Sequence, residues 1–135
     1  QNFNDFQKIL VWLKKNNYQT MDIIGLDGNR LDHMIGNFHI AIQQLKKFNF
    51  TIFTSTGILY TIEKNKIFEN CINKYFSIFS PNKNNKINTY GLRYEFKNKI
   101  LKDIQEGTLN IANKNKVTIK TQQKILVFIS KETEK

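Results

Sequence analysis

The stretch GLDGNRLDH, residues 25–33, places an arginine, two aspartates and a histidine around a glycine turn. A short apolar run precedes it and a long amphipathic run follows it, so it predicts a turn from a strand into a helix. The charges suit a helix start, with Asn29 as N-cap and Asp32 in the first turn. They also suit a phosphate or metal site at the exit of a strand, where α/β proteins place their chemistry. The stretch alone leaves both interpretations open.

Arg30 and Asp32 could act together on a phosphate group. They flank Leu31, which the apolar stripe of the following helix assigns to the core, so we expect both charges on the solvent side of the helix start. A cation and a carboxylate beside the N–H groups of a helix N-terminus can bind phosphate and Mg²⁺ together. His33 could donate to the same phosphate or bond to a backbone carbonyl.

Two further segments carry candidate residues. Asp5, in NDFQK, opens a predicted helix, and taken alone it predicts an N-cap. In NTYGLRY, residues 88–94, Gly91 stands between two tyrosines, which indicates a bulge or a close backbone approach. Tyr94 could stack on a flat ligand, or pack in the core or in a cross-strand pair.

Several other chemistries find no support in the sequence. A single cysteine, Cys71, excludes an internal disulfide and a CxxC metal site, and it suits a reducing compartment, so we expect the cytoplasm. His33 and His39 are poorly spaced to share one ion on a helix face, and no G-x-S-x-G motif is present. No apolar run approaches the roughly 20 residues that span a bilayer, and the first residues do not resemble a signal peptide.

The composition is that of a globular protein with a basic surface. The 135 residues, 40% of them hydrophobic, suffice for the core of one domain or two small ones. A net charge of +10 makes nucleic acid a partner to consider, although the lysines are scattered along the chain. The chain begins with Gln and not Met, so we expect a fragment or a chain that lacks its natural N-terminus.

Helical periodicity is confined to the first part of the chain. Residues 5–16 predict a helix with an acidic start and lysines in its last turn, and residues 31–48 predict a longer one. Between them MDIIGL, residues 21–26, predicts a short, buried, parallel strand. The expected apolar stripes are Phe6, Ile9, Leu10 and Leu13 in the first helix, and Leu31, Met34, Ile35, Phe38, Ile42 and Leu45 in the second.

After Phe48 the pattern changes to short β-branched and aromatic runs separated by polar turns. In the last run Ile125, Val127 and Ile129 alternate with Leu126 and Phe128, so both faces need cover, as in a central strand or a strand at a subunit contact. The predicted strands are FTIFTST, ILYTIE, KIFE, KYFSIFSP, KINTYGLRYEF, KILKDI, TLNIAN, KVTIKT and KILVFIS.

The fold class is therefore an α/β N-terminal part, with a partial parallel sheet and helices, followed by an all-β sandwich domain. We place the first part at residues 1–60 and the sandwich at residues 61–135.

Taken together, these stretches resemble the thiamine pyrophosphokinase (thiamine diphosphokinase) family. NDFQK is similar to the family's TDFEK, and GLDGNRLDH to its GxxGGRxDH turn. FSIFSPNKNNKINTYGLRYEF is similar to its FSLIPL…GLKYPL or GLKWNL run, and GTLNIAN, residues 107–113, to its GTxxSN region. The matches follow the family's order and spacing and cover nearly all of the chain.

The resemblance implies an α/β domain that handles ATP and a β-sandwich that binds thiamine, in a homodimer whose active sites lie between subunits. It implies transfer of a diphosphoryl group from ATP to the hydroxyl of thiamine, which gives thiamine diphosphate and AMP. By the same resemblance Asp5 is a catalytic carboxylate that binds Mg²⁺, Arg30 contacts the ATP phosphates, and Asp32 orients the metal and the attacking hydroxyl. Thiamine would bind to Gly91, Leu92, Tyr94 and Asn113.

The sequence also departs from the family pattern. Asn4 replaces Thr, Gln7 replaces Glu, Asn29 replaces the second Gly, and Ala112 stands where Ser is common. We expect the family's remaining acidic residues, an Asp-x-Asp pair and an Asp just before Q-x-x-[TN]-D, upstream of Gln1. Without them we would predict no catalysis.

Two alternative functions remain. A basic, β-rich nucleic-acid-binding module would bind arbitrary DNA or RNA with an affinity that falls steeply with salt. A non-catalytic thiamine-binding protein would keep the sandwich site and lack the transfer reaction.

Overall fold

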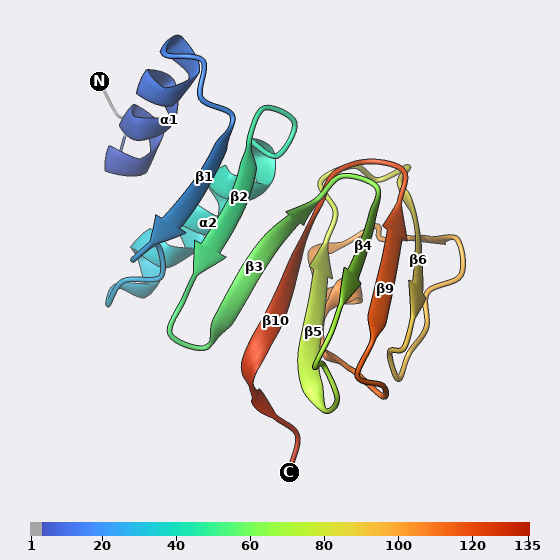
Figure 1. Cartoon of the computed structure of the whole chain (residues 1–135). Helices are drawn as coiled ribbons and strands as arrows, with labels where there is room; N and C mark the ends of the chain where they lie inside the picture. The colour runs from blue at the N-terminus through green and yellow to red at the C-terminus, as the bar shows by residue number, and fades with distance from the viewer. Residues whose placement is uncertain (1–3) are drawn as a thin grey trace.

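The computed structural model describes residues 4–135, and residues 1–3, with which the first predicted domain begins, lie outside the described part. Helices and strands are both present, strands predominate, and the strands form two sheets (Figure 1). The helical elements are α1 (Asp5–Lys15), α2 (Leu31–Gln43) and a 3-10 turn, η1 (Ile104–Gly107). The strands are β1 (Thr20–Ile24), β2 (Asn49–Phe53), β3 (Gly57–Ile62), β4 (Asn65–Phe68), β5 (Lys74–Phe79), β6 (Lys86–Tyr90), β7 (Lys99–Ile100), β8 (Asn110–Ile111), β9 (Val117–Thr121) and β10 (Ile125–Thr133).

Helix α1 begins with reciprocal hydrogen bonds between Asn4 and Gln7. The Gln7 N–H donates to Asn4 Oδ1 over 2.9 Å, and the Asn4 N–H donates to Gln7 Oε1 over 3.0 Å. Asp5 is therefore a first-turn residue, and its prediction as N-cap is wrong. Phe6 and Leu10 are buried as predicted, whereas Ile9 is exposed.

Strand β1 pairs in parallel with β2, as predicted, from Thr20 opposite Asn49 to Ile24 opposite Phe53. The prediction that β1 is buried is wrong, because Ile24 is 84% exposed. Among the described residues β1 pairs with β2 alone, and only its other face, with Met21 and Ile23, packs into the helical core.

Helix α2 begins at Leu31, as predicted, but its cap and its C-terminal end differ from the prediction. Its N-cap is Arg30 and not Asn29, and no side chain caps it. It ends at Gln43, because residues 44–47 form a turn that brings Leu45 into the core. Leu31 and Ile35 are exposed, since the buried contacts of this segment are made later, by Ala41 and Leu45.

The larger sheet has six strands in the order β1-β2-β3-β10-β5-β8, and the smaller has four in the order β4-β9-β6-β7. The described part thus has one sheet that extends from the parallel β1–β2 pair into the antiparallel strands. Strand β10 lies between β3 and β5, so the central-strand interpretation of KILVFIS is correct within this chain.

The alternation along β10 serves two cores. Val127 and its neighbours on one face join the core shared with the smaller sheet, which also contains Ile87 and Ile119. Leu126 and Phe128 on the other face join the core beneath α1 and α2. Within residues 4–135, no helix is both long enough and apolar enough to cross a membrane.

The segment KILKDI is only partly a strand. Pairing in β7 stops at Ile100 opposite Lys86, because β6 begins there and offers no further partner. The chain then turns into η1, where Ile104 is exposed rather than buried in a strand.

Candidate functional site

The charges of GLDGNRLDH lie in two separate environments, and Arg30 and Asp32 form the solvent-exposed one. Arg30 Nε donates to Asp32 Oδ1 over 3.2 Å and Nη2 to Oδ2 over 2.6 Å, which is a bidentate ion pair. The hydrogen bond from Arg30 lowers the pKa of the Asp32 carboxyl below its ordinary value.

This arrangement at the start of α2 can receive a phosphate. The ion pair leaves the other N–H groups of the Arg30 guanidinium available, and the uncapped helix start presents its own backbone N–H groups. His33 is exposed in the same turn. An anion placed here would meet the remaining guanidinium N–H groups and the positive end of the helix dipole, beside the Asp32 carboxylate that pairs with the same guanidinium.

Asp5 is not joined to this pair by any hydrogen bond or ion pair. Its carboxylate lies 3.6 Å from Lys8 Nζ and its side chain is 98% exposed. The start of α1 nevertheless lies beside α2, because Asn4 Nδ2 donates to Asn37 Oδ1 over 3.1 Å. Within residues 4–135 no group of three or more His, Cys, Asp or Glu side chains could hold a metal ion.

Asp27, the other aspartate of the stretch, ties the turn after β1 to the turn after β2. Asp27 Oδ2 accepts from the Ser55 N–H over 2.9 Å and from Ser55 Oγ over 3.0 Å. The backbone hydrogen bond from Ser55 lowers the pKa of this carboxyl. Asp27 therefore has a structural role that fixes the turn from which Arg30 and Asp32 project.

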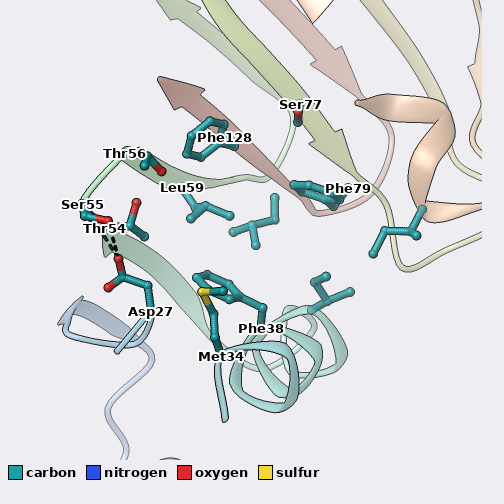
Figure 2. Close-up of a pocket in the computed structure, with 13 residues that line it drawn as sticks. Asp27, Met34, Phe38, Thr54, Ser55, Thr56, Leu59, Ser77, Phe79 and Phe128 are labelled. Atoms are coloured by element: carbon teal, nitrogen blue, oxygen red, sulfur yellow. Dashed lines mark hydrogen bonds between the residues drawn. The ribbon is translucent and has the colours of Figure 1, made fainter. Parts of the chain in front are cut away.

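Asp27 also marks the polar end of an apolar cavity of about 520 Å³. Figure 2 shows Met34 and Phe38 of α2 on one side of it, with Leu59, Phe79 and Phe128 of the larger sheet on the other. Arg30, Asp32 and Tyr94 are not among its lining residues. The cavity and the charged pair are therefore distinct features.

The second candidate region is the loop after β6, and Gly91 is required at its start. Gly91 has φ +103°, and a Cβ there would overlap the carbonyl oxygen of Lys116. Both reasons favour glycine, so the predicted close backbone approach is confirmed.

Glu95 folds this loop. Its Oε1 accepts from the N–H groups of Gly91 and Leu92, both over 2.7 Å, and its Oε2 accepts from Thr89 Oγ1 over 2.9 Å. Thr89 Oγ1 in turn accepts from the Phe96 N–H over 2.8 Å. The carboxylate thus closes the loop on itself and leaves Tyr94 at its tip, 63% exposed.

The structure brings the two predicted thiamine-site segments together. The Asn113 N–H donates to the Gly91 carbonyl over 2.8 Å, the Arg93 N–H donates to the Ile111 carbonyl over 2.8 Å, and Leu92 bridges Ala112. Gly91, Leu92, Tyr94 and Asn113 therefore belong to one local structure, although twelve residues separate GLRY from GTLNIAN.

The charged pair and this loop lie at opposite edges of the larger sheet. Arg30 follows β1 at one edge, and residues 91–94 pair with the segment that contains β8 at the other edge. Five strand spacings separate β1 from β8 in the strand order, which corresponds to a distance of about 24 Å. One small substrate cannot contact both regions on a single chain.

Comparison with family models shows to which protein family this chain belongs. Residues 57–128, more than half of the chain, match the family model described as "Thiamin pyrophosphokinase, substrate-binding domain". The chain belongs to the thiamin pyrophosphokinase family. The matched residues include strand β8 and the loop that follows β6. They do not include α1 or the ion pair of Arg30 and Asp32.

Solved structures of the family share the fold. The chain is similar to thiamine pyrophosphokinase from Bacillus subtilis, with 18% identity and a TM-score of 0.72 over all of this chain and 65% of that one. It is similar to thiamin pyrophosphokinase from Geobacillus thermodenitrificans, with 17% identity and a TM-score of 0.68 over all of this chain and 63% of the other. It is also similar to thiamin pyrophosphokinase from Candida albicans, with 13% identity and a TM-score of 0.66 over 92% of this chain and 51% of that one.

The chain thus spans between 51% and 65% of the length of these family members. Comparison with curated protein sequences finds no match.

The motifs did not predict the roles of three residues that hold local structure together: Glu95, Asn110 and Asp27. Glu95 stands where the family runs quoted above have Pro or Asn, a departure that could have drawn attention to it. Asn110 and Asp27 bond to backbone groups distant in sequence, at Tyr94 and Ser55, and no local pattern reveals such partners.

Proposed function

We propose that this protein is a thiamine diphosphokinase, an ATP:thiamine diphosphotransferase that gives thiamine diphosphate and AMP. The observation that carries the proposal is the pairing of Gly91 with Asn113 within the matched substrate-binding domain. The two segments that the family resemblance assigned to one ligand are hydrogen-bonded neighbours.

In the proposed reaction the hydroxyl oxygen of thiamine attacks the β-phosphorus of ATP. A new O–P bond forms, the bond between that phosphorus and the bridging oxygen of the α-phosphate breaks, AMP leaves, and the hydroxyl proton is released. Arg30 offsets the charge that develops on the phosphoryl oxygens, with His33 as a further donor, and Asp32 orients the attacking hydroxyl. Such transfers depend mainly on positioning and charge neutralisation.

Tyr94 is proposed to stack on the thiamine rings, with Gly91, Leu92 and Asn113 forming the rest of the pocket. The exposed ring offers a flat face, and the cationic thiazolium would gain about 0.5–2 kcal/mol from a cation–π contact.

We further propose that residues 1–60 are the C-terminal part of an ATP-handling α/β domain and that residues 61–135 are a thiamine-binding β-sandwich. The core shared by the two sheets supports the second assignment. Strand β3 spans the proposed boundary, so the two parts share the larger sheet.

Mg²⁺ is proposed as the cofactor because the family resemblance implies it. The described residues do not by themselves make a magnesium site, since no cluster of three or more candidate ligands occurs among them and Asp5 supplies a single exposed carboxylate.

A homodimer with shared active sites would solve the problem of the separated regions. On the face of β3, β10 and β5 that also carries α2, the cavity beside Asp27 and a second depression share the lining residues Thr56, Ser77 and Phe128. We propose that a second copy packs on this face and brings its Tyr94 to Arg30 and Asp32 of the first.

A product assay tests the proposed reaction. The full-length protein, given thiamine, ATP and Mg²⁺, should release AMP in equal amount to thiamine diphosphate, measured by chromatography. ADP as the nucleotide product would reject diphosphoryl transfer. Thiamine binding in calorimetry without any turnover would instead support the non-catalytic alternative.

A further inference from the structure

The Asn110 side chain holds both backbone polar groups of Tyr94. Asn110 Oδ1 accepts from the Tyr94 N–H over 3.1 Å, and Nδ2 donates to the Tyr94 carbonyl over 2.7 Å. Oδ1 also accepts from the N–H of Ile111 over 3.0 Å. A side chain that is itself nearly fully buried, at 4% exposed, therefore fixes the backbone of a residue whose ring is 63% exposed.

An amide suits this role better than any other short side chain. It presents an acceptor and a donor side by side, so it can match the N–H and the C=O of one residue together. A carboxylate can accept from the N–H but repels the carbonyl, and a hydroxyl reaches only one of the two groups. Two-point attachment restrains the direction in which the Tyr94 ring leaves the loop, and not only the position of the loop.

The attachment also joins the two sheets. Asn110 lies in β8, where it pairs with Phe76 of β5 in the larger sheet, whereas the loop of Tyr94 continues from β6 of the smaller sheet. In the described part of the chain, the Glu95 carboxylate bonds only to groups on its own side of the contact, among them the N–H groups of Gly91 and Leu92 in the same loop. Among residues 4–135, Asn110 is the one residue whose side chain hydrogen-bonds residue 94 to the edge of the larger sheet.

We propose that Asn110 is a positioning residue that sets the orientation of the Tyr94 ring for stacking on the flat, cationic substrate. The inference rests on the proposed function, because it requires that Tyr94 contacts thiamine. Asn110 itself does not touch the ligand, and its whole effect on binding passes through residue 94.

A double-mutant cycle on the full-length protein tests this, with thiamine binding measured by calorimetry. Asn110→Ala should weaken thiamine binding about tenfold, the equivalent of one to two hydrogen bonds. The same change in a Tyr94→Ala background should cost little further affinity, because the ring to be positioned is gone.

Asn85 provides the matched control. It is fully buried and equally well bonded, since Asn85 Nδ2 donates to Thr121 Oγ1 and Oδ1 accepts from the N–H groups of Gln122 and Gln123. Those partners are remote from Tyr94 in the smaller sheet and its turns. Asn85→Ala should lower the unfolding temperature at least as much as Asn110→Ala and leave thiamine affinity unchanged.

Several results would overturn the proposal. An equal loss of affinity in Asn85→Ala, or an Asn110→Ala loss that persists in full without the Tyr94 ring, would show a merely structural role. Should Asn110→Ala fail to fold, the isosteric Asn110→Asp serves, and unchanged thiamine affinity in it would contradict the inference. Unchanged binding in Tyr94→Ala would reject the thiamine site itself.

Discussion

Asp32→Ala should lower kcat/KM for thiamine diphosphate formation about 10³-fold, the upper end of the loss that follows removal of one preorganised hydrogen-bonding group from an active site. The physical reason is twofold. The variant loses the carboxylate proposed to orient the attacking hydroxyl, and it frees the Arg30 guanidinium from the bidentate pair that holds it in place. Steady-state kinetics on the full-length protein measures the effect.

Loss of folding cannot account for such a result. Both side chains of the pair are well exposed, at 69% and 64%, and exposed ion pairs contribute about 0–1 kcal/mol to stability. Asp103→Ala is the matched control, because Asp103 is also exposed, also stands at a helix start, and makes no capping bond. Asp103→Ala should retain full activity, and equal losses in the two variants would remove Asp32 from the reaction.

Gly91→Ala should destabilise the protein by about 3 kcal/mol, from the positive φ and the steric overlap together. The added methyl group has no room, because it would meet the backbone carbonyl of Lys116 rather than a flexible side chain. Either the loop of Tyr94 or the segment before β9 must shift. Denaturant unfolding measures the stability, and the surviving folded protein should also bind thiamine more weakly.

Gly36 shows what an ordinary glycine does in the same chain. It lies within α2, and a Cβ there would meet nothing within 4 Å. Gly36→Ala should therefore stabilise the protein by about 0.5–1 kcal/mol, the usual gain from alanine in a helix. Similar stability in Gly91→Ala and Gly36→Ala would contradict the strained geometry of the loop.

Periodic patterns predicted the elements well wherever one face of an element is buried. The alternation from Ile125 to Ile129 predicted both faces of β10, because each face packs into a separate core. The same reasoning failed at Leu31 and Ile24, which are apolar yet exposed. A hydrophobic stripe indicates which face can be buried, and it does not show where along the element the partner lies.

Helix caps were assigned to the wrong residues for a local reason. Asp5 and Asn29 are good capping types, but a cap depends on the backbone angles of one residue and on the partner three positions later. The signal was present at α1, because Asn4 and Gln7 have the spacing of a capping box. At α2 the N-cap is an arginine whose side chain makes no capping hydrogen bond. The residue preferences for N-cap positions do not predict an arginine there.

The candidate site could be predicted in its parts but not in its arrangement. Motif order identified Gly91 and Asn113, and the pairing of their segments follows only from the fold. The separation of Arg30 from Tyr94 depends on the strand order of the larger sheet, in which β10 inserts between β3 and β5. Sequence proximity carries no information on such long-range order.

The most direct test mixes two defective subunits. Asp32→Ala and Tyr94→Ala protomers, co-expressed with different tags and purified as the mixed dimer, would form one site with both defects and one site with neither. If the site is shared between copies, the mixed dimer should recover about half of the unaltered activity at low thiamine concentration, far above either parent. A mixed dimer no more active than its parents would contradict a site built from Arg30 and Asp32 of one copy and Tyr94 of the other.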